Sequence, residues 1–360
     1  MSVALLICDD SGMARKQLLK ALPPDWELDI TQASNGLEGL QAIRAGKGEL
    51  VLLDLTMPEL DGYQVLQAVR DEGLQAQIIV VSGDVQEQAV QRVLALGALQ
   101  FLQKPVDALD LRKAMRDPYL QLRSGGAAPA KPAAAQTPAA KAEPAPVPAA
   151  PAPAQNAAAQ LAEASIPFRD AFREINNVAM GRAAALLAKV LGVFIKLPIP
   201  NVNLLEVGEL HMALADAQRG GTVSAVCQGY IAGGISGEAL LIFHDSSFRD
   251  IAKLMKHEGA IDANVELELL MDLGCILIGA CLNGIAEQLD IRFSQGHPMV
   301  LGQHCAIDEL IRINQTRWKK TLAVEISYGI EHHDVHFDLL LLFSEDSVAR
   351  LTDKMGYLMS

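Results

Sequence analysis

The stretch LVLLDLTMPELDG at residues 50–62 decides the fold of the N-terminal part of the chain, because a short apolar run leads directly into Asp54. Comparable apolar runs end at the pair Asp9–Asp10, at Ser82 and at Lys104. Buried parallel strands that end in such residues bring them to one edge of a sheet, where open α/β folds place their ligands. Three carboxylates, a hydroxyl and an ammonium at one edge suit a divalent cation and a phosphoryl group.

Residues 1–123 alternate strand-like and helix-like segments. The strands are expected at 3–8, 27–33, 50–54, 77–82 and 99–103. The helices are expected at 11–21, 35–46, 62–72, 84–96 and 107–121. Five βα units of this kind predict one α/β domain with a doubly wound, five-stranded parallel sheet.

The polar set resembles a response-regulator receiver domain, the CheY-like module of two-component signalling. The matching motifs are the acidic pair, Asp54 in LLDLTMPELDG, Ser82 in VVSGD and Lys104 in FLQKP. The resemblance covers residues 1–122. It implies that a histidine kinase or a small phosphodonor phosphorylates Asp54.

The same resemblance implies Mg²⁺ as a cofactor, because an anionic phosphoryl group needs compensating charge to approach a carboxylate. The metal ligands would be Asp10, Asp54 and the carbonyl of Thr56, with Asp9 acting mostly through water. The phosphoryl oxygens would contact Lys104 and Ser82, and the signal would reach the surface through Ser82 and Phe101. The alternative is a decayed receiver that keeps the fold without the chemistry, and an aromatic such as Phe101 can also be a simple core residue.

Residues 124–160 consist mainly of Ala and Pro. Such a segment cannot bury a core, and each proline interrupts a helix. We predict a flexible linker that is long enough for the flanking domains either to touch or to work apart.

Residues 161–360 contain a diverged internal repeat, at about 165–258 and 264–356. SFRDIAKLM at 247–255 resembles SVARLTDKM at 347–355. Each half is expected to form a long helix, a strand, a short helical stretch, a β-hairpin and a final helix. The pattern predicts a pseudo-twofold α+β domain, with two long helices packed on a mostly antiparallel sheet. The strands are expected at 195–206, 222–231, 236–244, 291–301, 320–330 and 335–343.

The first long helix, expected from residue 165 to residue 192, carries a polar stripe. If the residues around Phe168 define the buried face, the stripe falls about 180–240° away from it and is expected to be exposed. Spacing by itself favours a solvated face, although a glycine there would let another backbone approach closely. The stripe consists of Asp170, Glu174, Asn177 and Gly181.

The stripe resembles the signature of the CheC/CheX/FliY phosphatase family, D-x3-E-x2-N followed by 22 residues and a proline. The matching residues are Asp170, Glu174, Asn177 and Pro200, within a helix EINNVAMGRAAALLAKVLG that is similar to the first long helix of that family. The resemblance covers most of residues 165–355. It implies hydrolysis of phosphoaspartate on a phosphorylated response-regulator receiver, which brings its own Mg²⁺.

The phosphatase resemblance also implies a role for each residue. Asn177 would hold the attacking water in line, because a carboxamide can orient water without acting as a general base. Glu174 would pair with the lysine of the docked receiver and fix its register. Asp170, Gly181 and Pro200 would support the site.

The matching positions of the second half have diverged. Glu268, Asp272 and Cys275 stand at the offsets of Asp170, Glu174 and Asn177. Aspartate is shorter than glutamate, and a cysteine cannot place water as an amide does. We expect this second centre to be inactive.

The composition of the chain argues against some partners and some cellular locations. A formal net charge of −13 argues against nucleic acid, and the apolar stretches read as core helices rather than membrane insertions. Five cysteines without CxxC spacing, and a start without a signal peptide, favour a cytoplasmic protein.

Together, these features predict a two-component signalling protein that takes part in chemotaxis or motility control. Its C-terminal domain is predicted to be a hydrolase that removes phosphate from a receiver domain, either that of another protein or its own. The alternative is a module that docks receivers without hydrolysis, or one that serves dimerisation. The sequence also allows a homodimer that forms through the face of the receiver domain containing Phe101.

Overall fold

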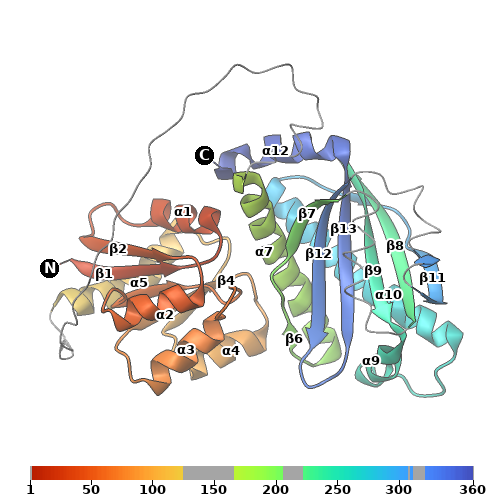
Figure 1. Ribbon diagram of the computed structural model, residues 1–360, viewed down its shortest axis with the longest axis horizontal. Helices are drawn as coiled ribbons and strands as arrows, with labels where there is room; N and C mark the ends of the chain where they lie inside the picture. Colours follow the sequence, from red (N-terminus) through yellow and green to blue (C-terminus); the bar gives the residue numbers. More distant parts are fainter. Residues whose placement is uncertain (1, 125–165, 206–221, 307–308, 311–320, 360) are drawn as a thin grey trace, which may run out of the picture.

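The computed structural model describes residues 2–124, 166–205, 222–306, 309–310 and 321–359. Two units with separate sheets lie side by side, an N-terminal unit (2–124) and a C-terminal unit (166–359), as Figure 1 shows. The predicted linker lies outside the described residues, except for its first residue.

The N-terminal unit has a five-stranded parallel sheet in the order β2–β1–β3–β4–β5. Helices α1 and α5 cover one face of this sheet, and α2, α3 and α4 cover the other. The prediction of a doubly wound α/β fold is confirmed. The strands are β1 (Val3–Cys8), β2 (Leu28–Ala33), β3 (Leu50–Leu53), β4 (Gln77–Ser82) and β5 (Gln100–Gln103), and the helices are α1 (Gly12–Ala21), α2 (Gly36–Arg44), α3 (Gly62–Asp71), α4 (Glu87–Ala95) and α5 (Ala108–Arg123).

Short polar side chains determine where these helices begin. Ser11, Asn35, Asp61 and Asp107 each accept a hydrogen bond from a backbone N–H of the first turn that follows. Such caps satisfy donors that the helix itself cannot pair. Each of these four helices therefore begins at a defined residue of the loop that follows the strand before it.

The C-terminal unit has an eight-stranded antiparallel sheet, in which the hairpins β8–β9 and β12–β13 join through a β9–β13 ladder. Strands β10 and β11 add to β8, and β6 and β7 add to β12. The bounds are β6 (Ile195–Lys196), β7 (Asn201–Leu205), β8 (Val223–Ala232), β9 (Ile235–His244), β10 (Ser294–Gln295), β11 (Met299–Cys305), β12 (Thr321–Ile330) and β13 (His336–Ser344).

Two predicted strands were wrong in their extent. The strand expected at 195–206 is divided into β6 and β7, and the one expected at 291–301 into β10 and β11. Pro198 and Pro200 stand in the first gap and Pro298 in the second. Proline has no N–H to donate to a ladder, so the strand is interrupted there.

The two long helices, α7 (Ile166–Leu191) and α10 (Ala263–Leu289), pack against each other and against the sheet. Their backbones come close, because a Cβ on Gly284 would lie 2.8 Å from the Cα of Ala179. Helix α10 is long and apolar enough to cross a membrane, but 61% of its most apolar window is buried in the protein. The prediction of an α+β unit with two core helices is confirmed. The shorter helical elements are η1 (Asp245–Ser247), α9 (Phe248–Leu254) and α12 (Glu345–Met359).

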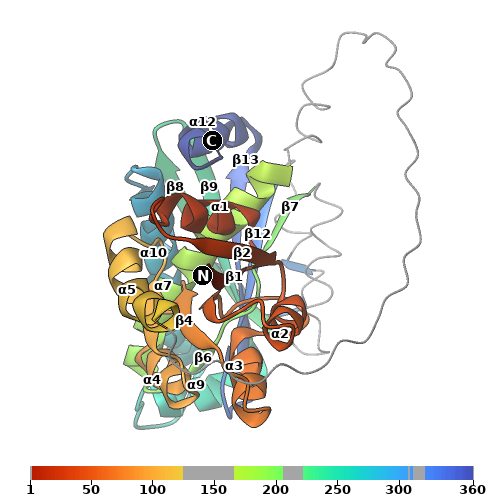
Figure 2. The ribbon, with the colours of Figure 1, turned by 90° about the vertical axis from the view of Figure 1, so that its left-hand side faces the viewer.

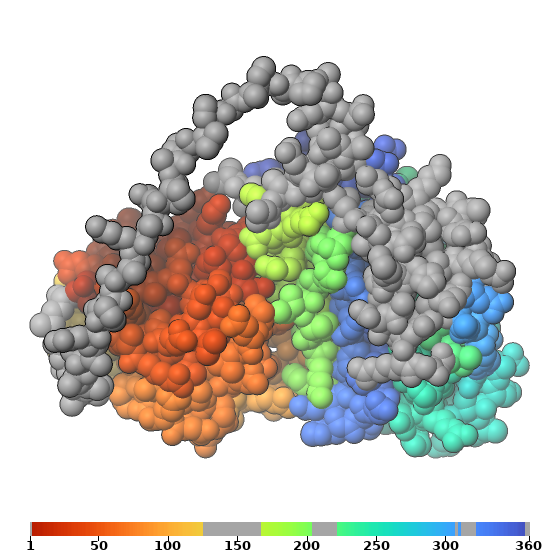
Figure 3. Space-filling model, in the orientation of Figure 1, coloured from red at the N-terminus to blue at the C-terminus, as the bar shows by residue number. Residues whose placement is uncertain are grey.

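The N-terminal unit lies against α7 rather than apart from it. Figure 3 shows the red and orange N-terminal unit abutting the yellow-green and green segments of the C-terminal unit, and Figure 2 looks at the same arrangement from the N-terminal side. Met13 of α1 belongs to the same buried apolar cluster as Phe168 of α7. The interface therefore continues the core of the C-terminal unit.

Far from this interface, a histidine links three elements of the C-terminal unit. His304 of β11 places Nδ1 3.0 Å from Asp245 Oδ2 and Nε2 3.0 Å from Glu266 Oε2. Ser224 donates to the other oxygen of Asp245 and accepts from the His304 backbone N–H. The hydrogen bond to Asp245, with the charge of both carboxylates, raises the pKa of His304 above 6.5.

The stability of the C-terminal unit should therefore fall as the pH rises through the pKa of His304. A folded-state pKa above the unfolded value gives stability that is complete below 6.5 and lost above the folded pKa. The difference in melting temperature between the wild type and His304→Gln should be largest at about pH 6 and absent at about pH 9. A difference that does not change with pH would contradict the role of the doubly protonated ring.

Candidate active site

Three aspartates meet where two neighbouring strands end. Asp9 and Asp10 follow β1, and Asp54 follows β3, which pairs with β1 in parallel. One carboxylate oxygen from each residue lies within 4.8 Å of the others. Asp9 and Asp54 are buried, and Asp10 is half-buried. The three aspartates therefore lie together at one edge of the sheet, as the predicted order of strands requires.

Lys104 supplies a positive charge to this cluster. It follows β5, and its Nζ lies 2.8 Å from Asp9 Oδ2 and 3.4 Å from Asp54 Oδ1. Burial on its own would lower the pKa of Lys104, but the surrounding carboxylates outweigh it and raise that pKa well above its usual range. The lysine is therefore a fixed cation at the site.

The other predicted receiver residues lie around the same edge. Ser82 ends β4, is fully buried, and its Oγ accepts a hydrogen bond from the Asp84 N–H at 3.1 Å, so its hydroxyl can still donate. Thr56 lies two residues after Asp54 and is half-buried. Phe101 of β5 packs on the apolar cluster of its domain, so its position is compatible with core packing as well as with a switch. The roles of these three residues stay predictions.

The donor set fits a divalent cation. Among the described residues, both oxygens of Asp54 and Asp9 Oδ2 are buried, and they have no hydrogen-bond donor besides the ion-paired Lys104. Burial raises the pKa of Asp54 well above its usual range and that of Asp10 to about 6. Buried carboxylates with so few donors are stabilised by an oxygen-binding cation such as Mg²⁺.

The polar stripe of α7 faces this site instead of solvent, which corrects the expectation of an exposed stripe. Glu174 is 5% exposed and Asn177 6% exposed. The stripe does point away from the core of its own unit, but the N-terminal unit covers it. A single helix pattern cannot distinguish a solvated face from a face that is covered by another domain.

Glu174 brings a third carboxylate to the buried lysine. Its Oε1 lies 3.0 Å from Nζ of Lys104. Burial, partly offset by Lys104, raises the pKa of Glu174 to about 7. The pair joins α7 directly to the residue that also contacts Asp54.

Asp170 binds the start of helix α1. Its carboxylate accepts hydrogen bonds from the backbone N–H of Gly12 at 3.3 Å and from that of Met13 at 2.7 Å. These donors have no partner within their own helix, and the helix dipole favours an anion at this end. Asp170 therefore caps α1 across the interface, and its supporting role in a phosphatase site stays a prediction.

Gly181 allows the two backbones to touch. A Cβ at this position would overlap the carbonyl of Gly83, in the loop after β4. Asn177 lies on the same face between Glu174 and Gly181, and a Cβ on Gly83 would come within 3.2 Å of the Asn177 carbonyl oxygen. The backbone of Asn177 thus lies beside the loop that follows Ser82, and the residue is 6% exposed.

Several contacts in this interface were not predicted from the sequence. Arg173 of α7 lies 3.3 Å from Asp10 Oδ2. Gln86 exchanges two hydrogen bonds with the backbone of Ile195, at 2.8 and 2.9 Å. These pairs connect distant positions of the chain, and no local pattern marks either partner.

A further unpredicted ion pair joins α4 to the residue that follows β12. Arg92 of α4 forms a bidentate pair with Glu331, at 2.7 and 3.1 Å, and its guanidinium stacks on the Phe194 ring at 4.4 Å. Planar pairing of this kind fixes orientation as well as distance.

The equivalent face of α10 is open. Glu268, Asp272 and Cys275 are all exposed. A Cβ on Gly279 would have only Gln295 Oε1 near it, at 3.9 Å. None of the described residues forms a docked partner for the second centre, and its predicted inactivity stays a prediction.

Comparison with known proteins identifies the N-terminal unit. The response regulator receiver domain matches residues 5–116. Chemotaxis protein CheY of Bacillus subtilis (strain 168) is 31% identical over 108 residues, which are 30% of this chain and 90% of CheY. This chain belongs to the response regulator receiver family. The N-terminal unit is its receiver domain, and the acidic cluster lies at the site expected for Mg²⁺ in that domain.

Two other relatives match about a third of this chain. The nitrate/nitrite response regulator NarL of Escherichia coli (strain K12) is 36% identical over 117 residues, 31% of this chain and 52% of NarL. Protein-glutamate methylesterase/protein-glutamine glutaminase 3 of Geobacter sulfurreducens is 36% identical over 104 residues, 29% of this chain and 28% of that protein. The chain thus spans between about a quarter and a half of the length of these curated relatives.

Two solved structures match parts of this chain. Thermotoga maritima FliY matches 53% of this chain and 96% of its own, with 20% identity and a TM-score of 0.40. A chain of the CheX–CheY–BeF3–Mg²⁺ complex from Borrelia burgdorferi matches 31% of this chain and 86% of its own, with 29% identity and a TM-score of 0.30. These TM-scores are too low to support an inference about function.

Substitution of Gly181 by Ala should separate the two units without harming the C-terminal fold. Alanine is a better helix former by about 1 kcal/mol, yet its methyl group would overlap the Gly83 backbone. We expect faster amide exchange around Gly83 and on the covered face of α7, and an unchanged or higher melting temperature of the C-terminal unit.

The matched control is Gly279→Ala on α10, where the new methyl group meets no docked domain. It should leave exchange in the receiver domain unchanged. Equal exchange around Gly83 in the wild type and in Gly181→Ala would contradict the close backbone contact.

Proposed function

We propose that the C-terminal unit is an aspartyl-phosphate phosphatase, and that its substrate in this arrangement is its own receiver domain, phosphorylated on Asp54. The observation that carries the proposal is the contact of Glu174 with Lys104, the lysine that also pairs with Asp54. This contact sets an α7 carboxylate beside the phosphoacceptor, and Asn177 lies one turn further along the same covered face.

The chemistry required is modest. Hydrolysis breaks the P–O bond to the Asp54 carboxylate and forms a new P–O bond from water, which yields the free carboxylate, inorganic phosphate and one proton. Lys104 compensates charge on the phosphoryl oxygens, and Ser82 donates a hydrogen bond to one of them. Glu174 fixes the lysine and the docking register, while the Asn177 amide orients the attacking water.

Mg²⁺ would be held by Asp10, Asp54 and the carbonyl of Thr56, with Asp9 nearby, and would supply positive charge to the developing transition state. Arg173 contacts Asp10 from α7, so the phosphatase helix also reaches the edge of this site.

Phosphorylation and docking exclude each other in this scheme. Asp54 is 1% exposed in the docked arrangement, so neither a histidine kinase nor a small phosphodonor reaches it there. The receiver domain would leave α7 to be phosphorylated and return to be dephosphorylated. Residues 124–160 would act as the tether that keeps the effective concentration high. We place this cycle in the cytoplasm, in two-component control of chemotaxis or motility.

A non-catalytic module is the second candidate function. Extensive burial of the α7 face by the receiver domain, with Asp170 and Arg173 bound to receiver groups, would also suit a unit that only sequesters receivers. The two functions differ in whether Asn177 is needed for loss of phosphate.

Replacement of Asn177 by Ala should slow the loss of phosphate from Asp54 by about 100-fold, because it removes a group that orients the nucleophile. The measurement follows the phosphorylated full chain over time after the phosphodonor is removed. Asp272→Ala and Cys275→Ala serve as controls on the open face of α10 and should leave the rate unchanged. Equal rates for the wild type and Asn177→Ala would favour the non-catalytic module.

Hydrolysis on the chain's own receiver should follow a first-order rate that does not depend on protein concentration. A tenfold dilution of the phosphorylated protein should leave the rate constant unchanged, because the two reacting units belong to one chain. A rate constant that falls in proportion to dilution would assign the reaction to a receiver on another molecule.

A further inference from the structure

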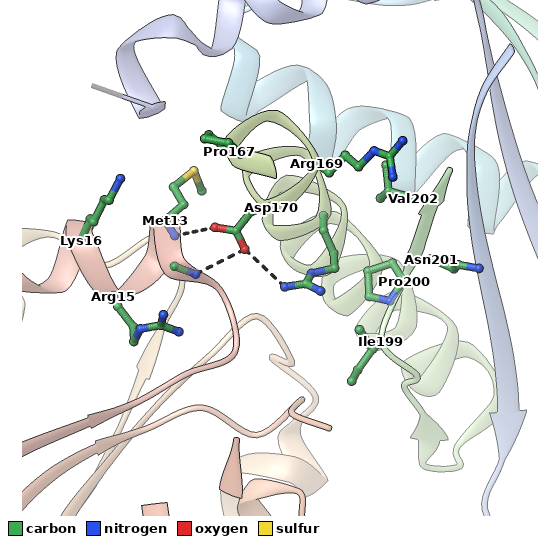
Figure 4. Close-up of a pocket in the computed structure, with 12 residues that line it drawn as sticks. Met13, Arg15, Lys16, Pro167, Arg169, Asp170, Ile199, Pro200, Asn201 and Val202 are labelled. Atoms are coloured by element: carbon green, nitrogen blue, oxygen red, sulfur yellow. Dashed lines mark hydrogen bonds and ion pairs between the residues drawn. The ribbon is translucent and has the colours of Figure 1, made fainter. Parts of the chain in front are cut away.

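A second feature of the interface is a cavity of about 720 Å³ between α1 and the start of α7. The receiver domain contributes four of its lining residues from α1, Gly12 to Lys16, and the C-terminal unit contributes the rest. Figure 4 shows Met13, Arg15 and Lys16 on one side, and Ile199, Pro200 and Asn201 across from them. The cavity therefore depends on docking of the two units.

Four cationic side chains line this cavity. They are Arg15, Lys16, Arg169 and Arg173. This concentration stands out in a chain whose net charge is −13. A concave site lined by charges of one sign concentrates counter-ions of the opposite sign.

The carboxylates near the cavity pair with one of these cations, because Arg173 lies 3.3 Å from Asp170 Oδ1 and 3.3 Å from Asp10 Oδ2, and the other three form no ion pair with a described residue. Asp170 is already bound to two backbone N–H groups of α1 and to Arg173. Lys16 and Arg169 form no ion pair with any residue that the structure describes. Arg15 donates to the carbonyl of Asp9 at 2.6 Å and to the side-chain oxygen of Gln32, both of which are uncharged acceptors.

The rest of the lining is mostly apolar. Beyond the charged groups, the wall consists of Met13, Pro167, Ile199, Pro200 and Val202, with the amide of Asn201 at its edge. Small-molecule sites combine such apolar surface with a few polar groups that fix orientation. A ligand with both an anionic and an apolar or planar part would use the whole cavity.

We propose that this cavity binds a small phosphorylated molecule with at least two negative charges and an apolar or planar part, such as a nucleotide. Because its cations come from both units, the bound anion stabilises the docked arrangement. The phosphoryl chemistry has two sources, a phosphorylated metabolite or the inorganic phosphate released at Asp54. The proposal concerns docking, so it holds whether or not the C-terminal unit hydrolyses Asp54 phosphate.

Linkage gives the size of the effect. A ligand that binds only the docked form raises the ratio of docked to separated molecules about 100-fold at a concentration 100 times its dissociation constant. Such a ligand would also shield Asp54 from phosphodonors by the same factor.

The test is calorimetric binding to the unphosphorylated full chain without Mg²⁺, so that the metal does not recruit phosphate to Asp54. ADP, pyrophosphate and orthophosphate are the three probes. The double variant Lys16→Ala with Arg169→Ala removes one cation from each unit. Its matched control, Lys20→Ala with Arg249→Ala, removes one exposed cation from each unit outside the cavity.

We expect ADP to bind one site, and the double variant to weaken it at least about 10-fold while the control variant does not. ADP binding should also slow amide exchange around Gly83. Tighter binding of ADP than of orthophosphate assigns the site to a phosphorylated metabolite. The reverse would contradict the apolar or planar part of the ligand and assign the cavity to the released phosphate.

Two results would overturn the proposal. One is the absence of binding by all three probes at millimolar concentration, and the other is equal affinity in the wild type and the double variant. Loss of Asn177 does not enter this test, so failure of the hydrolase assignment and failure of the anion site are distinguishable.

Discussion

The docked arrangement depends on one buried cation. Lys104 is 4% exposed and lies within ion-pair distance of Asp9 and Asp54 from its own domain and of Glu174 from α7. A buried charge is costly unless it is paired, and carboxylates buried together repel one another. The lysine offsets both costs at once, and a bound divalent cation would offset the remaining negative charge. The same charges that suit phosphoryl chemistry therefore also hold the two units together.

This coupling has a consequence for signalling. The covered site buries Asp54, and it sets Glu174 on the lysine that also pairs with Asp54. Docking and phosphorylation then compete for the same surface of the receiver domain. An anion in the cavity between α1 and α7 would shift that competition, because it adds contacts that exist only when the two units are together.

The two long helices of the C-terminal unit have similar outer faces, but only the face of α7 is covered by the receiver domain. Both long helices carry a glycine in the middle of their outer face, Gly181 on α7 and Gly279 on α10. Glycine within a helix costs about 1 kcal/mol relative to alanine, and only at Gly181 does a neighbouring backbone use the space. Glutamate and asparagine accompany that contact on α7, whereas aspartate and cysteine stand exposed on α10.

The sequence by itself determined the parallel sheet, the gathering of Asp9, Asp54 and Lys104, and the polar stripe of α7, because strand and helix periods are local properties. It also predicted two long helices on an antiparallel sheet, but it did not predict that prolines divide two of the strands of that sheet. Only the tertiary structure decided that the stripe is covered, that Asp170 caps α1, and that Arg173 reaches Asp10. Those contacts join residues that are far apart in the chain, and they depend on how the surface of the receiver domain fits the surface of α7. The periodicity of either segment in the sequence does not predict this complementarity.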